Sequence, residues 1–153
     1  MKVIGVAGPS DSGKTTVVER LARRLDELGT VATVKHLTHE PDVDTEGKDT
    51  ARHRASGAVH TVGVTDEGEW FATGEGRDLD DILAEFDRRY EYAVVEGSSG
   101  SGLPKVVLGG RAAEGPVVAT APEADALDLD AVVSFLRDAP PYEPDTSSDR
   151  DER

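Results

Sequence analysis

The sequence contains no cysteine, which excludes disulfide bonds and thiolate metal sites. Long apolar runs are also missing, and no stretch reaches the length of about 18 residues that spans a bilayer. The first apolar run begins at Val3, which leaves no room for a signal peptide ahead of it. These absences predict a cytoplasmic protein that does not enter membranes. Its 153 residues suit a single domain with one core.

Basic residues are scarce, and only five of them are lysines. The chain has 31 acidic against 17 basic residues, which gives a net charge of −14. So acidic a surface repels nucleic acid and anionic membranes, and neither is expected as a partner. The acid-rich, lysine-poor composition resembles that of halophilic proteins, in which salt screens the self-repulsion. The alternative is an acidic face that binds a basic partner.

We therefore expect the fold to be less stable at low ionic strength. The Debye length is about 30 Å at 0.01 M salt and about 3 Å at 1 M, so only the higher concentration screens neighbouring carboxylates from one another. Thermal unfolding at both salt concentrations measures the effect, and Tm should rise with salt. A Tm that is the same at both concentrations would contradict the halophilic interpretation.

A glycine-rich motif follows the first apolar run. Residues 8–15 read Gly-Pro-Ser-Asp-Ser-Gly-Lys-Thr, which fits the phosphate-binding loop, or Walker A motif, G-x-x-x-x-G-K-[ST]. The glycines let several backbone N–H groups point at one anion, Lys14 can reach the β- and γ-phosphates, and Thr15 can bind Mg²⁺. Residues 3–7 before the motif predict a buried strand, and residues 16–28 after it predict a helix. This context favours a nucleotide site over a glycine-rich turn that binds nothing.

The rest of the chain alternates between strand and helix patterns. Further strands are predicted at residues 31–36, 59–64, 69–72, 92–97, 105–108 and 116–120, and helices at 48–56, 79–89 and around 129–136. The order predicts an α/β protein: a three-layer P-loop NTPase fold with a mostly parallel central sheet and a small β-hairpin extension. Residues 1–139 should form this nucleotide-binding domain. Residues 140–153 predict an acidic disordered tail.

Charged residues follow two of the predicted strands. Glu96 ends the apolar run 92–97, where an acid in phosphate-loop proteins commonly orients Mg²⁺ through water; the alternative is an ordinary acid at a strand end. A second cluster follows the strand 31–36, beyond which ligands bind in open α/β sheets. It consists of Lys35, His36, His39, Asp42 and Asp44. This cluster could bind a transition metal, reach Mg²⁺ and phosphate, or form a solvated loop.

A third group of charges is basic. Lys48, Arg52 and Arg54 lie within seven residues of an otherwise acidic chain, which indicates either an anion pocket or a solvated helix face. No Ser/His/Asp or Cys/His arrangement suggests covalent catalysis. The sequence also lacks an Asn-Lys-x-Asp motif to read guanine, so the residues themselves leave the base open.

Several segments together resemble a known family. They are Thr15-Thr16, Lys35-His36-Leu37-Thr38-His39, Asp42-Val43-Asp44, Gly47-Lys48-Asp49-Thr50 with Arg52, Ala55-Ser56-Gly57-Ala58, Val95-Glu96-Gly97 and Leu103-Pro104-Lys105-Val106. In this order and spacing the chain, over about residues 1–110, is similar to the molybdopterin-guanine dinucleotide biosynthesis protein B family. The block from Lys35 to Asp49 is far more specific than the phosphate loop alone.

The resemblance implies a dimeric GTP-binding protein with weak, Mg²⁺-dependent GTPase activity, which assists the guanylyltransferase that joins GMP to molybdopterin. The implied ligands of GTP and of the second ligand or partner are Gly8, Pro9, Ser10, Asp11, Ser12, Gly13, Lys14, Thr15, Thr16, Lys35, His36, His39, Lys48 and Arg52. Thr15, Asp44 and Glu96 would hold Mg²⁺, and Lys14, Asp44 and Glu96 would be catalytic. Two alternatives stay open: an ATP-dependent small-molecule kinase or ligase, and a nucleotide-binding scaffold that does not hydrolyse.

Overall fold

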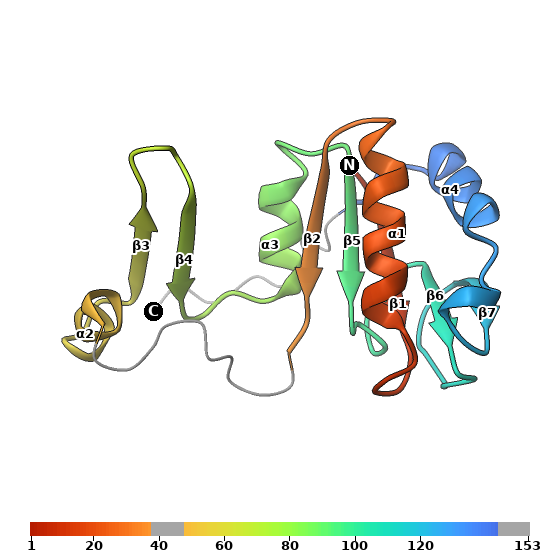
Figure 1. Ribbon diagram of the computed structural model, residues 1–153, viewed down its shortest axis with the longest axis horizontal. Coiled ribbons are helices and arrows are strands. Elements are labelled where there is room, and N and C mark those ends of the chain that lie inside the picture. The colour runs from red at the N-terminus through yellow and green to blue at the C-terminus, as the bar shows by residue number, and fades with distance from the viewer. Residues whose placement is uncertain (38–47, 144–153) are drawn as a thin grey trace. The chain divides into compact units, whose positions relative to one another are not determined.

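The structure is a computed structural model that describes residues 1–37 and 48–143. Its chain divides into two compact units (Figure 1). The first unit contains residues 1–36 and the chain from Leu79 onward, and the second contains residues 37–78. The phosphate loop and Glu96 both belong to the first unit, so the candidate site can be described within it.

A five-stranded parallel sheet forms the centre of the first unit. Its order is β2-β5-β1-β6-β7, with every neighbouring pair parallel. The strands are β1 Lys2–Ala7, β2 Val31–Lys35, β5 Tyr92–Glu96, β6 Lys105–Leu108 and β7 Val117–Ala121. A parallel sheet is covered on both faces, which is why β1, β5 and β6 are nearly continuous apolar runs.

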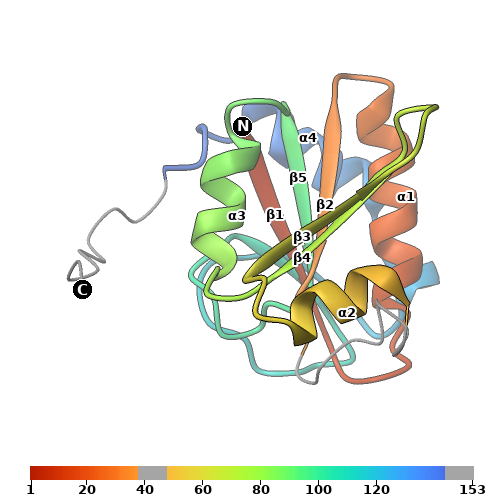
Figure 2. The same ribbon diagram turned by 90° about the vertical axis from the view of Figure 1, so that its left-hand side faces the viewer.

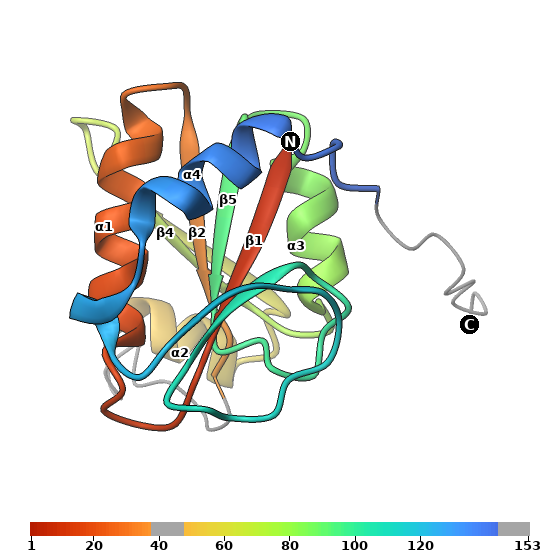
Figure 3. The same ribbon diagram turned by 90° about the vertical axis from the view of Figure 1, so that its right-hand side faces the viewer.

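Helices cover both faces of this sheet. The helices α1 (Lys14–Asp26) and α4 (Leu129–Asp138) share one core with alternate sheet residues such as Ile4, and α3 (Leu79–Phe86) packs on the other face with Val3. Figure 2 shows α3 and α1 on opposite sides of the sheet, and Figure 3 shows α4 on the side of α1. Side chains alternate across a strand, so neighbouring residues of β1 enter different cores. The predicted three-layer α/β fold is therefore confirmed.

The helix α1 follows from the spacing of its apolar residues. Val17, Leu21 and Leu25 recur every four positions and are fully buried against the sheet. Each such leucine stabilises the fold by about 1.5–3 kcal/mol relative to an exposed one. Among the described residues, no helix is long and apolar enough to cross a membrane.

The end of α1 differs from the expected one. Gly29 has the residue type of a helix C-cap, but α1 ends at Asp26 and Glu27 is its C-cap, with an ordinary right-handed φ of −68°. A side chain at Gly29 would collide with the Glu91 carboxylate, which accepts a hydrogen bond from the Thr30 N–H at 2.9 Å. Glycine at this position thus leaves room for the Glu91 carboxylate, and it is not used for a left-handed conformation.

The second unit contains the predicted hairpin. Its helix α2 (Asp49–Ala55) contacts β3 (His60–Val64), which pairs antiparallel with β4 (Trp70–Gly74). In this register Val62 faces Ala72 and Val64 faces Trp70, on one side of the hairpin. The side chains of Val62, Val64 and Trp70 are exposed by 53%, 72% and 64%. Successive side chains of β3 and β4 point to opposite sides of the hairpin, so Thr61 lies on the other side, where it is buried.

The chain after α4 returns to the start of the first unit. The Tyr142 N–H donates to the Met1 carbonyl at 2.7 Å, and its hydroxyl donates to Asp80 at 2.9 Å. Its ring packs against the core that contains Leu83. Residues 144–153 of the predicted tail lie outside the described residues, and the boundary at 139/140 stays a prediction.

Candidate phosphate-binding site

The Walker A segment connects β1 to α1 at the carboxyl edge of the sheet. Gly13 is the N-cap of α1 and adopts the left-handed conformation, with φ 88°. No side chain caps this helix end, and the first turn contains no acid. Its first N–H groups and the positive end of the helix dipole therefore have no anionic side chain to neutralise them there, which is the local condition for binding an anion.

Glycine is required twice in this loop. A Cβ on Gly13 would lie 2.8 Å from the Cβ of Ala124, and one on Gly8 would lie 2.6 Å from the Ser12 Oγ and 3.1 Å from Leu108. The loop is thus packed tightly against two other segments of the unit. Both glycines of the motif are needed for space, and Gly13 is needed for conformation as well.

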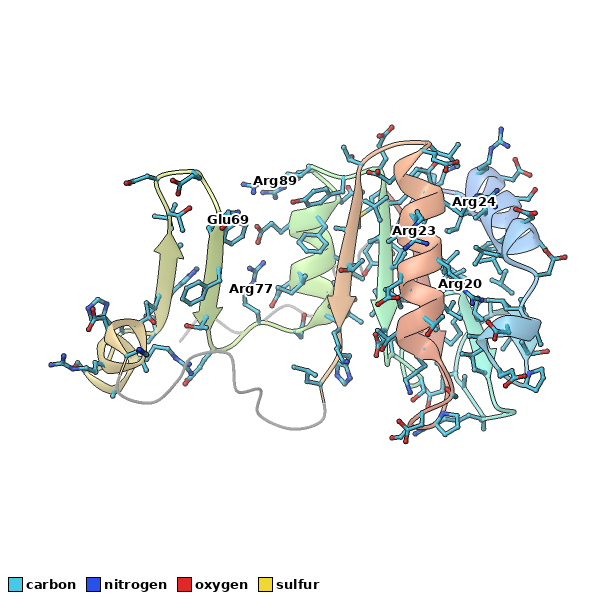
Figure 4. The ribbon with its side chains drawn as sticks, viewed as in Figure 1. Arg20, Arg23, Arg24, Glu69, Arg77 and Arg89 are labelled. Atoms are coloured by element: carbon cyan, nitrogen blue, oxygen red, sulfur yellow. The ribbon has the colours of Figure 1, made fainter. Side chains whose placement is uncertain are left out.

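The segment that contacts Gly13 is held in place by α1. It is the short 3-10 helix η1 (Ala124–Ala126), and Arg20 donates to its Ala124 carbonyl at 3.3 Å and to the Asp125 carboxylate at 2.6 Å. Arg24, one turn later, pairs with Asp130 of α4 at 2.8 Å. Figure 4 shows these arginines along α1. Two solvent-exposed ion pairs therefore connect η1 and α4 to α1, the helix that begins at the phosphate loop.

Four side chains of the predicted site, Lys14, Thr15, Lys35 and Glu96, lie at this edge, and two of them contact the Glu96 carboxylate. The Thr15 hydroxyl lies 3.2 Å from both carboxylate oxygens of Glu96, and the Lys35 ammonium lies 3.4 Å from one of them. Glu96 is only 8% exposed. The Lys14 ammonium donates to the Pro9 carbonyl at 2.5 Å.

The parallel register explains this meeting. Glu96 is paired with Lys35 across the β2–β5 ladder and with Val6 across the β1–β5 ladder. The carboxyl ends of the three strands therefore coincide, one residue before β1 turns into the phosphate loop. A hydroxyl and a carboxylate that share hydrogen bonds form an oxygen donor set of the kind that Mg²⁺ prefers, so the residues fit this ion.

The other predicted site residues do not contact the Glu96 carboxylate in the described part of the chain. His36 follows β2, and its N–H donates to the Glu96 carbonyl at 2.8 Å while its side chain is exposed. Lys48 and Arg52 belong to the second unit, where Lys48 is the N-cap of α2 and Arg52 lies 3.9 Å from Asp49. His39 and Asp44 lie outside the described residues. Within residues 1–37 and 48–143, no three His, Asp or Glu side chains converge as a metal site.

The loop contains an acid in an unusual conformation. Asp11 has φ 59° and is the one residue other than glycine with positive φ in the described chain. Aspartate tolerates this conformation better than most residues, but still at some cost. Its side chain is exposed and carries a negative charge within the loop that should receive phosphates.

We expect Asp11→Gly to raise the affinity for a nucleoside triphosphate by about 3- to 10-fold, because it removes one charge that repels the phosphates. Calorimetric titration of both proteins measures the change. Asp11→Asn is the control, since it removes the charge and keeps the shape and the preference for positive φ. If neither variant binds more tightly than the wild type, this carboxylate does not face the phosphates.

Sequence reasoning missed one residue near this edge. Lys105, the first residue of β6, is fully buried, and its ammonium donates to the carbonyls of Ser98 and Ser101 at 3.0 and 2.6 Å. Burial lowers the pKa of Lys105 from its ordinary value of 10.5, and the Glu114 carboxylate opposes that shift. The available signal was a lysine directly before the apolar run Val-Val-Leu, where a buried charge needs partners. The composition of residues 98–102 predicts a mobile loop, yet these hydrogen bonds hold it.

The fold and the loop at the sheet edge define a class: this is an α/β protein with the P-loop NTPase fold. Residues 3–134 match the family model of MobB, molybdopterin guanine dinucleotide synthesis protein B, and the chain belongs to that family. The family resemblance drawn from the sequence motifs is therefore confirmed.

Individual relatives agree with this assignment. The chain is 37% identical over 142 residues to a probable molybdopterin synthase of Haloferax volcanii, with 93% of this chain and 49% of that protein aligned. It is 36% identical over 113 residues to a putative molybdopterin-guanine dinucleotide biosynthesis adapter protein of Methanocaldococcus jannaschii (71% and 47%). It therefore spans about half the length of these relatives. The crystal structure of Bacillus subtilis MobB is similar with a TM-score of 0.72 at 25% identity, covering 91% of this chain and 100% of that one.

Proposed function

We propose that this chain is a GTP-binding adapter protein in the biosynthesis of molybdopterin guanine dinucleotide, with weak Mg²⁺-dependent GTPase activity. One observation carries the proposal: the hydroxyl of Thr15, next to the phosphate-loop lysine, meets the carboxylate of Glu96 at 3.2 Å in a chain of the MobB family. Relatives from Methanocaldococcus jannaschii and Haemophilus influenzae bear the adapter name. The cytoplasmic location is part of the same proposal.

The loop side chains would act on the phosphates as follows. The Lys14 ammonium donates to a neutral carbonyl of the loop, and a phosphate oxygen is a stronger, charged acceptor for it. The exchange of one acceptor for the other would release the Pro9 carbonyl. Thr15 and Glu96 would hold Mg²⁺, which when bound neutralises charge on the β- and γ-phosphates. The Lys35 ammonium, 3.4 Å from one Glu96 oxygen, would help to direct this carboxylate towards Thr15.

Hydrolysis by this arrangement is proposed to be slow. Within residues 1–37 and 48–143, the predicted side chains placed at this edge are Lys14, Thr15, Lys35 and Glu96, and none of these four is an arginine that could stabilise the charge of the transition state. Asp44 is proposed to be a second metal-side, catalytic acid beside Glu96. His36, His39, Lys48 and Arg52 are proposed to line the face towards the second ligand or partner, molybdopterin or its guanylyltransferase.

A reconstituted reaction tests the adapter role. Purified guanylyltransferase, molybdopterin and GTP are combined with and without this chain, and the guanylylated cofactor is quantified. The chain should increase the yield, and a variant that lacks the Lys14 ammonium should not. Equal yields with and without the chain would refute the adapter role, whatever the chain's affinity for GTP.

The exposed side of the hairpin supports a homodimer. Val62, Val64 and Trp70 lie on one side of the hairpin with more than half of each side chain exposed, and exposed apolar side chains grouped in this way are one mark of a protein interface. We expect the wild type to sediment as a dimer and the double variant Val62→Ser, Trp70→Ser to sediment as a monomer at tens of micromolar, because burial of these side chains drives association. Analytical ultracentrifugation measures both.

The matched control for the dimer is Val117→Ser. Val117 is an exposed valine of β7 in the first unit, with 49% of its surface accessible. This variant should sediment like the wild type. A wild type that is monomeric at the same concentration would remove dimerisation from the proposed function and leave the nucleotide site untouched.

A further inference from the structure

Lys105 is the largest side chain in the described part of the chain that has no exposed surface. Its ammonium lies 3.0 Å from the Ser98 carbonyl oxygen, 3.4 Å from that of Ser99 and 2.6 Å from that of Ser101. An ammonium group has three N–H donors, so three carbonyls from one short segment match its capacity. The loop is thus folded around a cation that the chain itself provides.

Besides the Lys105 ammonium, the segment is held from outside by the Glu114 N–H, which donates to the Ser99 carbonyl at 2.8 Å. Residues 97–102 read Gly-Ser-Ser-Gly-Ser-Gly and contribute no apolar side chain, and such sequences are flexible when nothing holds them. The buried Ser98 hydroxyl has no hydrogen-bond partner among the described residues, so this side chain does not anchor the loop. The Ser98 carbonyl, by contrast, accepts from Lys105 and from the Ser101 N–H and hydroxyl at 3.1 and 2.9 Å.

The loop begins directly after the acid of the candidate site. Gly97 has φ 89°, and its N–H donates to the Val6 carbonyl at 2.9 Å. A Cβ on Gly5 would lie 2.8 Å from the Ser98 Oγ and 3.2 Å from the Lys105 Cβ. The loop and the lysine stem are therefore packed together on β1, which directs the chain away from β5 at the residue after Glu96.

We propose that Lys105 is a positioning residue for Glu96: its buried ammonium binds the carbonyls of Ser98, Ser99 and Ser101 and so fixes the exit of β5 where Glu96 faces Thr15. Without the ammonium, the Ser101 carbonyl would lose its donor, and the Ser98 and Ser99 carbonyls would keep only their backbone and hydroxyl donors, so the loop would open to water. The Glu96 carboxylate would then lose its fixed direction. The consequence for Mg²⁺ rests on the proposed function, but the effect on the loop does not.

The test compares Lys105→Met with the wild type in two measurements. Hydrogen exchange of residues 96–102 should become at least about tenfold faster, since the hydrogen bonds that close the loop are lost. The gain in GTP affinity on adding Mg²⁺ should fall about tenfold, while the affinity in EDTA changes less than about twofold, as expected for loss of a group that orients a metal ligand. A merely structural lysine would lower both affinities together.

The control variant is Lys2→Met. The Lys2 ammonium also donates to a backbone carbonyl, that of Arg137, but it lies at the opposite end of β1. The Lys2→Met variant should show the wild-type hydrogen exchange of residues 96–102 and the wild-type effect of Mg²⁺ on GTP affinity. If Lys105→Met does not fold, Lys105→Gln keeps two N–H donors and should give intermediate exchange.

A measurement on the wild type requires no variant. In ¹⁵N-lysine-labelled protein, the Nζ–H correlation of a buried, hydrogen-bonded ammonium stays visible at neutral pH. If no protected Nζ–H signal is present, the caged ammonium is refuted.

The outcomes separate the two proposals. If the wild type does not bind GTP, the proposed function fails, and the exchange data still decide whether Lys105 holds the loop. If the wild type binds Mg²⁺–GTP and a folded Lys105→Met variant exchanges residues 96–102 at the wild-type rate, the positioning role alone is overturned. Faster exchange with an unchanged Mg²⁺ effect would also overturn it, because Glu96 would not depend on the loop.

Discussion

In the Lys14→Ala variant, the affinity for GTP is expected to fall by at least about 100-fold, the usual consequence of removing one charged donor from a preorganised anion site. Lys14 supplies the full positive charge of the phosphate loop, and the other donors there are backbone N–H groups and the end of the α1 dipole. Calorimetric titration with GTP in Mg²⁺ measures the loss.

The Tm of the Lys14→Ala variant distinguishes a loss of GTP binding from unfolding of the protein. The contact recorded for the Lys14 ammonium is to the Pro9 carbonyl near the surface, so Tm should change by no more than a few degrees. Lys2→Ala, at the other end of β1, is the control and should bind GTP like the wild type. Micromolar affinity for GTP in a folded Lys14→Ala protein would refute the assignment of the loop.

The second large effect is on stability. Gly13→Ala is expected to lower the free energy of unfolding by roughly 2–4 kcal/mol, which combines about 1–2 kcal/mol for a left-handed alanine with the cost of overpacking. The new methyl group would lie 2.8 Å from the Ala124 Cβ, on a segment that Arg20 and Asp125 hold in place. To make room for the methyl group, Ala124 would have to shift, which would disturb the hydrogen bonds that Arg20 donates to Ala124 and Asp125. Denaturant unfolding of both proteins measures the difference.

Gly110→Ala is the matched control for that experiment. Gly110 also has a positive φ, 66°, but a Cβ built on it meets no atom within 4 Å. The control isolates the conformational cost, about 1–2 kcal/mol, from the steric one. If the two variants are equally destabilised, Gly13 is not packed against η1 as described.

Local patterns were enough to predict the elements that carry the loop. The apolar run before Gly8 and the four-residue spacing of Val17, Leu21 and Leu25 determine a strand and a helix whatever the rest of the chain does. Glu96 could be singled out because a charge ends an apolar strand. That it contacts Thr15 depends on β5 lying between β1 and β2, which is a long-range pairing.

The parts that sequence reasoning missed depend on contacts that no periodicity encodes. The Lys105 ammonium binds carbonyls four to seven residues earlier in the chain, in a loop whose composition alone predicts mobility. Gly29 has the residue type of a helix cap, but its place is set by the Glu91 carboxylate, 62 positions further on. Backbone oxygen positions and a distant acid decide these two sites, and neither is visible in the local sequence.

The central claim is a phosphate pocket with a metal-side acid, and one titration tests it most directly. The wild type is titrated with GTP, GDP and ATP at high salt, in Mg²⁺ and again in EDTA. We expect saturable binding of GTP that Mg²⁺ strengthens, with a smaller Mg²⁺ effect for GDP, which lacks the γ-phosphate. Absence of binding for all three nucleotides in Mg²⁺ would contradict it.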